Sequence, residues 1–289
     1  MAPFCASHIG RLCMLANALI YTGERMVPEY ADSHTFWEHV SRYAFVTRWV
    51  KGQRVLDIAS GEGYGCEALL KAGAKSVIGV DIDEQSCAHA VRKYNIDARV
   101  GDAENIPVET GSIDVVVSFE TIEHVPNPRR FMHEILRVLS PDGMLIISTP
   151  DKSVYHEGNP FHCSEMTSRE FQSLIGEVFP NVTVFGQHPH SAKWWNPLSL
   201  ISDTCQWDSL RGVHRLRRKL WSNLNGRRLN AVPEEARRRT TELILHPRIS
   251  WLERILDLYA IRSLGRSCGW SPIYIIAVAY KGVAPLDHY

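Results

Sequence analysis

The sequence lacks several features that would assign it to a specialised class of protein. Its 289 residues include seven cysteines but no Cys-x-x-Cys pair, so neither a disulfide framework nor a structural zinc site is expected. Its apolar stretches all fall short of the ~18 residues that a membrane-spanning helix needs. The 32 basic residues equal the 32 acidic ones, so the whole chain has no net attraction for nucleic acid or membranes. We therefore expect a globular protein of a reducing compartment, the cytoplasm.

The balanced charge conceals one strongly basic segment. Residues 188–270 carry 15 Lys and Arg against 7 Asp and Glu, a balance of +8, and the rest of the chain carries −8. Six of the eight tryptophans lie in the same segment. Because an uneven charge distribution points to an interaction surface, we interpret residues 188–270 as an inserted, helix-prone subdomain.

Predicted strands and helices alternate along most of the remaining chain. Apolar or β-branched runs predict strands at 54–60, 76–83, 112–120, 143–150, 181–187 and 272–282, and a short third strand within 96–104. Amphipathic spacing predicts helices at 64–73, 84–95, 127–140 and 167–179, the last with a capping box of Thr167 and Glu170. This alternation is typical of a doubly wound parallel sheet, which binds ligands at the carboxyl ends of its strands.

The turn after the first predicted strand, in VLDIASGEGYG (55–65), holds three glycines. Glycine lets the backbone bend tightly and approach a ligand closely. The spacing G-x-G-x-G alone is a weak sign of nucleotide binding. However, Asp57, Asp81 and Asp102 fall in or just after the first three strands, with no Lys or Arg among them. Such a site suits a cofactor with a cationic end and no phosphate, which describes S-adenosylmethionine.

Five motifs together resemble the class I S-adenosylmethionine-dependent methyltransferases. They are VLDIASGEGYG, VIGVDID (77–83), GDAENIP (101–107), SFETIEHV (118–125) and RVLSPDGMLIISTP (137–150). The resemblance implies an α/β, Rossmann-like seven-stranded sheet that is parallel except for an antiparallel last strand, with a helical insertion before that strand. The cofactor-binding domain would then comprise residues 51–187 and 271–283.

The resemblance also implies which residues hold the cofactor. The implied set is Asp57, Gly61 and Gly63 at the methionine part, Asp81 at the ribose, Asp102 and Ala103 at the adenine, together with Arg25, Ala59, Ile82 and Glu120. Ser60 is a mild departure, because the family often has Gly or Cys at that position.

A finer resemblance lies outside these motifs. TGERMVPE (22–29), EHVSRYAF (38–45) and NPFHCSEMTSREF (159–171) are similar to methyltransferases that occur with glycosyltransferases and act on sugars of surface glycans or glycolipids. It implies that residues 1–50 form a helical lid that brings Glu24 and Arg25 over the cofactor, with Arg42 and Tyr43 on the following helix. The alternative is that TGERMVPE is an ordinary surface loop.

The predicted catalytic residues follow the fourth and fifth strands. Transfer of a sulfonium methyl to a hydroxyl requires an aligned acceptor and removal of its proton. In one mechanism His124 or His162 is the general base, with Glu123 beside it. In the other, Glu120, Glu123, His124 and His162 hold Mg²⁺ or Mn²⁺, because E-x-x-E-H followed by H-x-x-E-x-T resembles plant-type small-RNA 3′-terminal 2′-O-methyltransferases. A capping role for His124 is the purely structural alternative.

We expect O-methylation of a sugar, glycolipid or other hydroxylated small molecule. In this interpretation, tryptophans of 188–270 stack on sugar rings and arginines clamp a phosphate, with peripheral contact at the inner membrane face. One alternative is an RNA 3′-terminal ribose 2′-O-methyltransferase, with nucleic acid the less favoured partner. Another is a non-catalytic, cofactor-binding partner of a glycosyltransferase. The segment can also be read as a plain helical core covered by solvated arginines.

Overall fold

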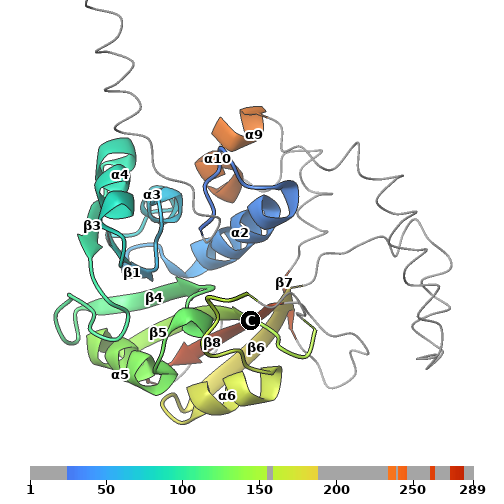
Figure 1. Ribbon diagram of the computed structural model, residues 1–289. Helices are drawn as coiled ribbons and strands as arrows, with labels where there is room; N and C mark the ends of the chain where they lie inside the picture. Colours follow the sequence, from blue (N-terminus) through green and yellow to red (C-terminus); the bar gives the residue numbers. More distant parts are fainter. Residues whose placement is uncertain are drawn as a thin grey trace, which may run out of the picture.

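The computed structural model describes residues 25–154, 159–187, 234–238, 240–245, 261–263 and 274–282. Its strands are β1 (Arg54–Ile58), β2 (Ser76–Asp81), β3 (Asp97–Val100), β4 (Ile113–Phe119), β5 (Leu139–Pro150), β6 (Asn181–Gln187), β7 (Ile261–Ser263) and β8 (Tyr274–Tyr280). Its α-helices are α2 (Ser33–Val46), α3 (Tyr64–Lys71), α4 (Glu84–Tyr94), α5 (Pro128–Val138), α6 (Ser168–Gly176), α9 (Glu234–Arg238) and α10 (Thr240–Leu245). Two 3₁₀ turns, η1 (Thr47–Trp49) and η2 (Ile122–His124), complete the described elements. Figure 1 shows how the helices and strands are arranged.

These strands form one sheet with the order β3-β2-β1-β4-β5-β8-β6-β7. β8 runs antiparallel to both of its neighbours, β5 and β6, whereas β1 to β5 pair in parallel. The seven predicted strands and the antiparallel last strand are therefore confirmed. The short β7 is an eighth strand that the sequence did not predict, and it pairs with β6 from within residues 188–270.

Helix ends follow local capping chemistry. The Asp83 side chain accepts hydrogen bonds from the backbone N–H groups of Gln85 and Ser86, which starts α4. The predicted capping box of Thr167 and Glu170 is present at the start of α6. β5 begins at Leu139, four residues earlier than predicted, directly after α5.

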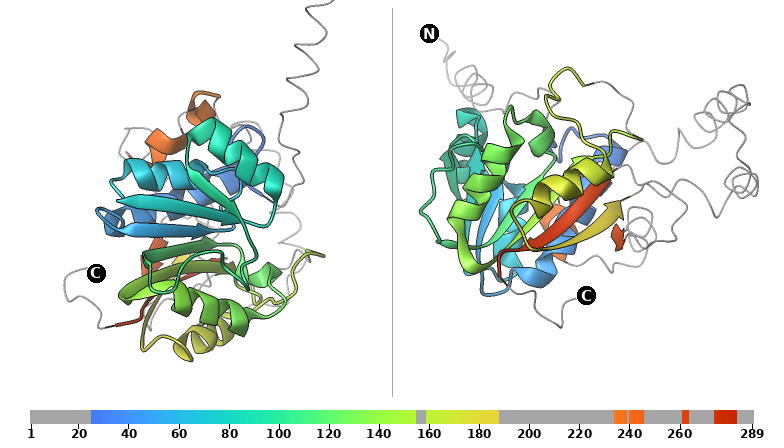
Figure 2. Two further views of the ribbon diagram at one scale, coloured as in Figure 1. Left: turned by 90° about the vertical axis from the view of Figure 1, so that its left-hand side faces the viewer. Right: turned by 90° about the horizontal axis from the view of Figure 1, so that it is seen from below.

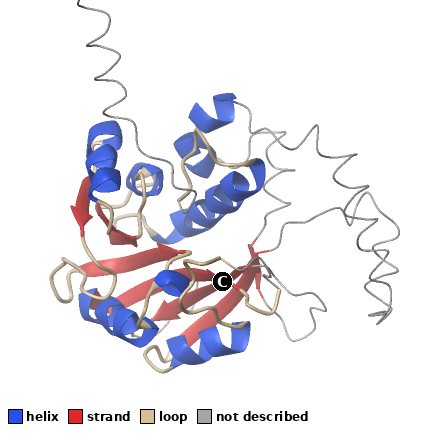
Figure 3. Cartoon of the chain, viewed as in Figure 1, coloured by secondary structure: helices blue, strands red, loops and turns tan. Residues whose placement is uncertain are grey.

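The helices cover both faces of the sheet, so the sheet is buried on both sides (Figures 2 and 3). Neighbouring residues of β4 point to opposite cores: Val117 joins the cluster that includes α2 and α3, and Val116 joins the cluster that includes α5 and α6. Both valines are fully buried. This two-sided burial explains the almost continuously apolar sequence of the central strands.

The described parts of 1–50 and 188–270 pack against this sheet. α2 contributes Phe36 and Val40 to the core, and α10 contributes Ile244, all fully buried. Arg237 of α9 donates hydrogen bonds to the carbonyls of Pro28 and Ala31. The division into a lid, a methyltransferase domain and an acceptor-binding subdomain stays a prediction.

Several sequence predictions lie outside the described residues. They are Glu24, the six tryptophans of 188–270, and the basic runs at 215–219 and 226–228. Among the helices that the structure does describe, none is long and apolar enough to cross a membrane.

Candidate functional site

Two glycines of the turn after β1 have different structural roles. Gly61 has φ +55°, and a Cβ added there would meet nothing within 4 Å. Gly63 has φ +96°, and a Cβ added there would lie 2.7 Å from Cβ of Ala90 in α4. Gly61 thus keeps one side of the turn open, while Gly63 allows the turn to pack closely against α4. Ala59, just before them, also has a positive φ, 58°.

The carboxylate of Asp81 lies directly beside this turn. Its Oδ2 accepts a 2.8 Å hydrogen bond from the N–H of Gly61, and its Oδ1 accepts one of 2.9 Å from the N–H of Asp83. Next to it Ile82 is 77% exposed, which is unusual for an isoleucine and leaves an apolar surface at the end of β2. The predicted ribose site and the glycine turn are therefore adjacent.

Asp102 and Ala103 follow β3 at the same edge of the sheet. Asp102 Oδ1 accepts a 2.8 Å hydrogen bond from the N–H of Glu104, and Asp102 also forms an isolated bridge with Asn105. Ala103 is partly buried against the core. The predicted adenine residues thus form a turn whose backbone is held by the aspartate itself.

Asp57 is buried in β1 and points to α2. It is 1% exposed, and its Oδ2 accepts hydrogen bonds from the Tyr43 hydroxyl at 2.9 Å and from the Cys66 thiol at 3.4 Å. Burial raises the pKa of Asp57 to about 7, although both hydrogen bonds favour the ionised form. A cationic group placed near Asp57 would favour its carboxylate.

The segment before α2 is attached to α4 through charged side chains. Arg25 donates to Asp83 Oδ2 at 2.5 Å and also contacts the hydroxyl of Ser86. Arg25 is therefore anchored to a residue two positions after Asp81, and its place over the cofactor stays a prediction.

Lys93 forms a second attachment that the sequence did not predict. Its Nζ lies 2.8 Å from Glu29 and 3.2 Å from Glu62, the residue between the two turn glycines. Glu62 is 1% exposed and also accepts a 2.7 Å hydrogen bond from the Tyr94 hydroxyl. A glutamate in a glycine-rich turn normally suggests exposure. The sequence feature that accompanies its burial is the Lys-Tyr pair at the end of α4, the helix that follows β2.

Two carboxyl groups lie at the end of β4, that of Glu123 buried and that of Glu120 partly buried. The Glu120 Oε1 accepts a 2.6 Å hydrogen bond from Ser148, and the Glu123 Oε2 accepts one of 3.1 Å from Thr149. Glu120 has φ 50°, an uncommon conformation that turns the chain at the strand end. Burial, followed by repulsion from Glu120, raises the pKa of Glu123 well above its ordinary range.

The imidazoles of His124 and His162 meet edge to face, with ring centroids 4.9 Å apart. His162 Nδ1 lies 3.1 Å from Glu165 Oε1, and His124 Nδ1 lies 3.2 Å from the carbonyl of Phe161. The loop that carries His162 is attached to η2, because the carbonyl of Glu123 accepts hydrogen bonds from the next two N–H groups, of residues 163 and 164.

One potential ligand atom each from Glu123, His124 and His162 lies within 4.8 Å of the others. These are three of the four residues that the sequence suggested for a metal ion. Glu120 is not in this group; its carboxylate accepts a hydrogen bond from Ser148 and lies 3.6 Å from the guanidinium of Arg42.

Arg42 is itself buried in the site region. It is 1% exposed, donates a 3.1 Å hydrogen bond to Gln187 Oε1, and lies with Cζ 4.6 Å from the ring centroid of Tyr274. From the sequence, Arg42 was predicted only as part of the lid. No motif points to Gln187 and Tyr274, which are far apart in the chain and meet because β6 pairs with β8.

Among the known proteins with similar sequences are methyltransferases and probable methyltransferases. Residues 56–147 match the family described as a methyltransferase domain. A probable S-adenosylmethionine-dependent methyltransferase of Mycolicibacterium smegmatis is 37% identical over 168 residues, which cover 56% of this chain and 65% of that protein. A probable S-adenosylmethionine-dependent methyltransferase of Mycobacterium tuberculosis (strain ATCC 25618 / H37Rv) is 35% identical over 177 residues, covering 58% of this chain and 64% of that protein.

A structural comparison shows the fold. The crystal structure of an S-adenosylmethionine-dependent methyltransferase from Thermotoga maritima has a TM-score of 0.53 at 16% identity and covers 86% of this chain and 91% of its own. The chain spans slightly less than two thirds of the curated relatives it matches. Residues 56–147 are therefore similar to a methyltransferase domain, and the chain has the class I, Rossmann-like fold that the motifs indicated.

Proposed function

We propose that this chain, whose residues 56–147 match a methyltransferase domain, transfers the methyl group of S-adenosylmethionine to a hydroxyl of a sugar, glycolipid or related molecule. The observation that carries the proposal is the placement of two groups of residues at one edge of the sheet. The open glycine turn follows β1, Glu123 and His124 follow β4, and His162 follows β5, which is paired with β4. β1 and β4 are hydrogen-bonded neighbours.

The first group suits a sulfonium nucleoside. Gly61 leaves space beside the turn, and the carboxylate of Asp81 is held at the position where a ribose diol would donate hydrogen bonds. Asp57 would stabilise the ammonium of the methionine part. Because Asp57, Asp81 and Asp102 all carry carboxyl groups, a cofactor with a pyrophosphate would be repelled here.

The second group supplies a base. In the transfer, the acceptor oxygen bonds to the methyl carbon, the electron pair of the breaking bond returns to sulfur, and the hydroxyl proton passes to the base. A carbonyl only accepts hydrogen bonds, so contact with Phe161 keeps the proton of His124 on Nδ1. Glu165 favours the same tautomer of His162. Both imidazoles then have Nε2 as their basic nitrogen, and His162, oriented by a carboxylate, is the better base.

The same atoms support metal-assisted activation as the alternative mechanism. Two imidazoles and the carboxylate of Glu123 form a nitrogen-rich set of three donors. Such a set suits Mn²⁺ better than Mg²⁺, which prefers oxygen ligands. A bound divalent cation would lower the pKa of an acceptor hydroxyl.

The test has two stages. Calorimetry with S-adenosylhomocysteine should show binding that falls at least about tenfold in Asp81→Ala, as expected for loss of charge-assisted hydrogen bonds. Glu177→Gln, at the exposed residue directly after α6, should bind like the wild type. Incubation of extracted glycolipids, glycans and RNA with methyl-labelled S-adenosylmethionine should then label a glycolipid or glycan. Absence of binding heat would overturn the proposal, and label confined to RNA would favour the ribose methyltransferase.

The two mechanisms differ in their response to chelator. A general base works unchanged after dialysis against EDTA, and His162→Ala then loses turnover while binding of S-adenosylhomocysteine persists. If turnover disappears in EDTA and returns with Mn²⁺, the metal-assisted mechanism is correct.

A further inference from the structure

A buried polar cluster lies where α2 crosses the carboxyl ends of the central strands. Arg42 and Glu38 are one turn apart on α2, Glu120 follows β4, and Gln187 pairs with Tyr274 where β6 ends and β8 begins. Arg42, Glu38 and Gln187 are each at most 2% exposed. Two segments outside the 56–147 family match, α2 and the β6–β8 pair, thus add polar groups to the same edge as the methyltransferase residues.

This cluster is directly connected to the proposed catalytic group. The Ser148 hydroxyl donates a hydrogen bond to Glu120, and the hydroxyl of the next residue, Thr149, donates a hydrogen bond to Glu123. Glu120 in turn lies 3.6 Å from the Arg42 guanidinium. A molecule bound at Arg42 would therefore lie beside the residues that deprotonate an acceptor.

One donor of this cluster has no partner within the described residues. The Nε–H of Arg42 is buried and makes no hydrogen bond, although the same guanidinium donates to Gln187 through another nitrogen. A buried donor without an acceptor costs free energy, so its retention calls for an explanation. A bound acceptor oxygen would supply the missing hydrogen bond.

The surrounding charges restrict what that oxygen can belong to. The guanidinium interacts electrostatically with both Glu120 and Glu38, so its positive charge is already compensated. A phosphate or carboxylate would approach two carboxyl groups and gain little from the arginine. A neutral hydroxyl fits both kinds of partner, since it accepts from the arginine and donates to a carboxylate.

We propose that Arg42, Glu38, Glu120 and Tyr274 form an acceptor subsite that binds a neutral, hydroxylated group, such as the face of an uncharged sugar ring. The Tyr274 ring, which lies over the guanidinium, offers an apolar side for the ring carbons. This subsite rests on the proposed function, and it narrows the acceptor from hydroxylated molecules in general to those whose methylated part carries no charge.

The test measures sugar binding to protein saturated with S-adenosylhomocysteine. The probes are methyl α-D-glucopyranoside and methyl α-D-galactopyranoside as neutral sugars, and glucuronate and glucose 6-phosphate as anionic ones. Saturation-transfer NMR should detect the neutral glycosides and show weaker signals for both anions. If S-adenosylhomocysteine binds but the neutral glycosides do not, the subsite is wrong and the cofactor part of the proposed function stands.

Arg42→Lys tests the unpaired donor without removing the positive charge. Lysine lacks the Nε–H donor of the guanidinium. Affinity for the neutral glycosides should therefore fall roughly tenfold, which is the effect expected from the loss of one hydrogen bond to a charged group. The dissociation constant of S-adenosylhomocysteine should stay within about twofold. Arg54→Lys is the matched control, because Arg54 pairs with Asp114 at the opposite edge of the sheet. Glycoside binding unchanged in Arg42→Lys would overturn the proposal.

Glu38→Gln keeps the shape of the cluster and tests the charge argument separately, even if Arg42→Lys fails to fold. Removing one of the two compensating carboxylates should raise the affinity for glucuronate relative to methyl glucopyranoside. Two results would contradict the charge argument and indicate that Arg42 binds anions. One is an unchanged ratio of the affinities for glucuronate and methyl glucopyranoside, and the other is a preference of the wild-type protein for the anionic sugars.

Discussion

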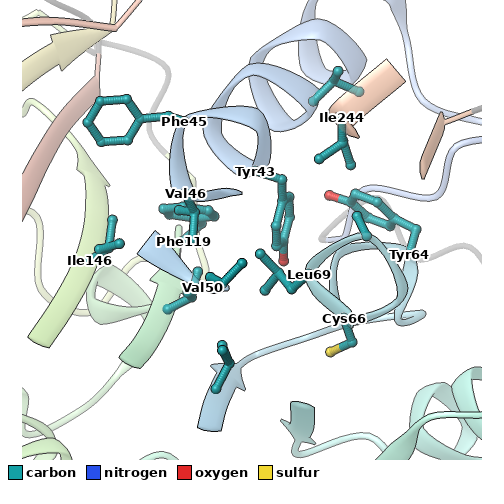
Figure 4. Close-up of a cluster of buried hydrophobic side chains, with 14 of the residues drawn as sticks. Tyr43, Phe45, Val46, Val50, Tyr64, Cys66, Leu69, Phe119, Ile146 and Ile244 are labelled. Carbon is teal, nitrogen blue, oxygen red and sulfur yellow. The ribbon is translucent and has the colours of Figure 1, made fainter. Parts of the chain in front are cut away.

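The Tyr43 hydroxyl donates a 2.9 Å hydrogen bond to Oδ2 of Asp57, which joins α2 to the first strand of the sheet. The Tyr43 ring is packed edge to face against the rings of Tyr64 and Phe119, with centroids 5.3 and 5.2 Å away (Figure 4). A helix that precedes the family match therefore reaches the residue expected to face the methionine part of the cofactor. The N-terminal segment is thus coupled to the proposed cofactor site through one buried hydroxyl.

Tyr43→Phe should weaken cofactor binding in a pH-dependent way. The hydrogen bond from Tyr43 favours the ionised form of Asp57, so its loss raises the pKa of Asp57 further above about 7. Affinity for S-adenosylhomocysteine should fall several-fold near neutral pH and recover at about pH 8.5, where the carboxylate reforms. Calorimetry at both pH values measures this. Tyr30→Phe, at an exposed tyrosine, is the control, and an equal loss at both pH values would contradict the explanation.

Asp57 should also make stability depend on pH. Burial raises its pKa from 3.8 to about 7, so between these values the folded protein holds a proton that the unfolded chain has released. The free energy of unfolding therefore decreases as pH rises through this window, by up to ~1.4 kcal/mol per pH unit from this group.

Asp57→Asn removes this contribution. Between about pH 4.5 and about pH 7, urea unfolding should show the variant gaining stability relative to the wild type. The reason is that the side chain at position 57 titrates only in the wild type, whose free energy of unfolding therefore falls with rising pH. A stability difference that is independent of pH would mean that Asp57 is ionised throughout.

The features that could be predicted from the sequence are those that depend on local patterns of residues. Apolar runs and turn residues indicate seven strands, and the signal is strongest for the central strands, such as β4 and β8, which are buried on both faces. Two short motifs placed His124 and His162 in one predicted site, and their rings do lie in contact. The metal site that was predicted from Glu120, Glu123, His124 and His162 stays a prediction, and Glu120 lies outside the group of three potential ligands. Its carboxylate is bound by Ser148 and lies beside Arg42, and Arg42 belongs to a helix that no motif connects to β4. Contacts between distant segments, such as Gln187 with Arg42, leave no local pattern.

Gly61→Ala and Gly63→Ala should separate cofactor binding from stability. A methyl group at Gly61 points into open space and costs only the left-handed conformation, about 1–2 kcal/mol, but it would occupy the side expected to face the cofactor. A methyl group at Gly63 adds overlap with Ala90 and should cost about 1–3 kcal/mol more. Urea unfolding measures the loss of stability in each variant, and calorimetry with S-adenosylhomocysteine measures the loss of affinity. Relative to its loss of stability, Gly61→Ala should lose more affinity than Gly63→Ala. Wild-type affinity in Gly61→Ala would place the cofactor elsewhere.

Gly65→Ala should loosen the attachment of α2. A Cβ on Gly65 would overlap the Tyr43 ring. Flanking rings and the hydrogen bond to Asp57 hold that ring, so α2 itself must shift, at a cost of about 1–3 kcal/mol. Gly176 in α6 is the matched control: a Cβ there meets nothing within 4 Å, so Gly176→Ala should be neutral or stabilising by up to ~1 kcal/mol.

A double-mutant cycle identifies the obstacle at Gly65. If the new methyl group overlaps the Tyr43 ring, Gly65→Ala should lower the free energy of unfolding much less in a Tyr43→Ala background than in the wild type. In that background the space of the ring is empty. The coupling energy, measured by urea unfolding, should exceed ~0.5 kcal/mol, which is the scatter expected for independent sites. Additive effects would mean that the two residues do not meet in solution, and α2 would then not be held against the glycine-rich turn by this contact.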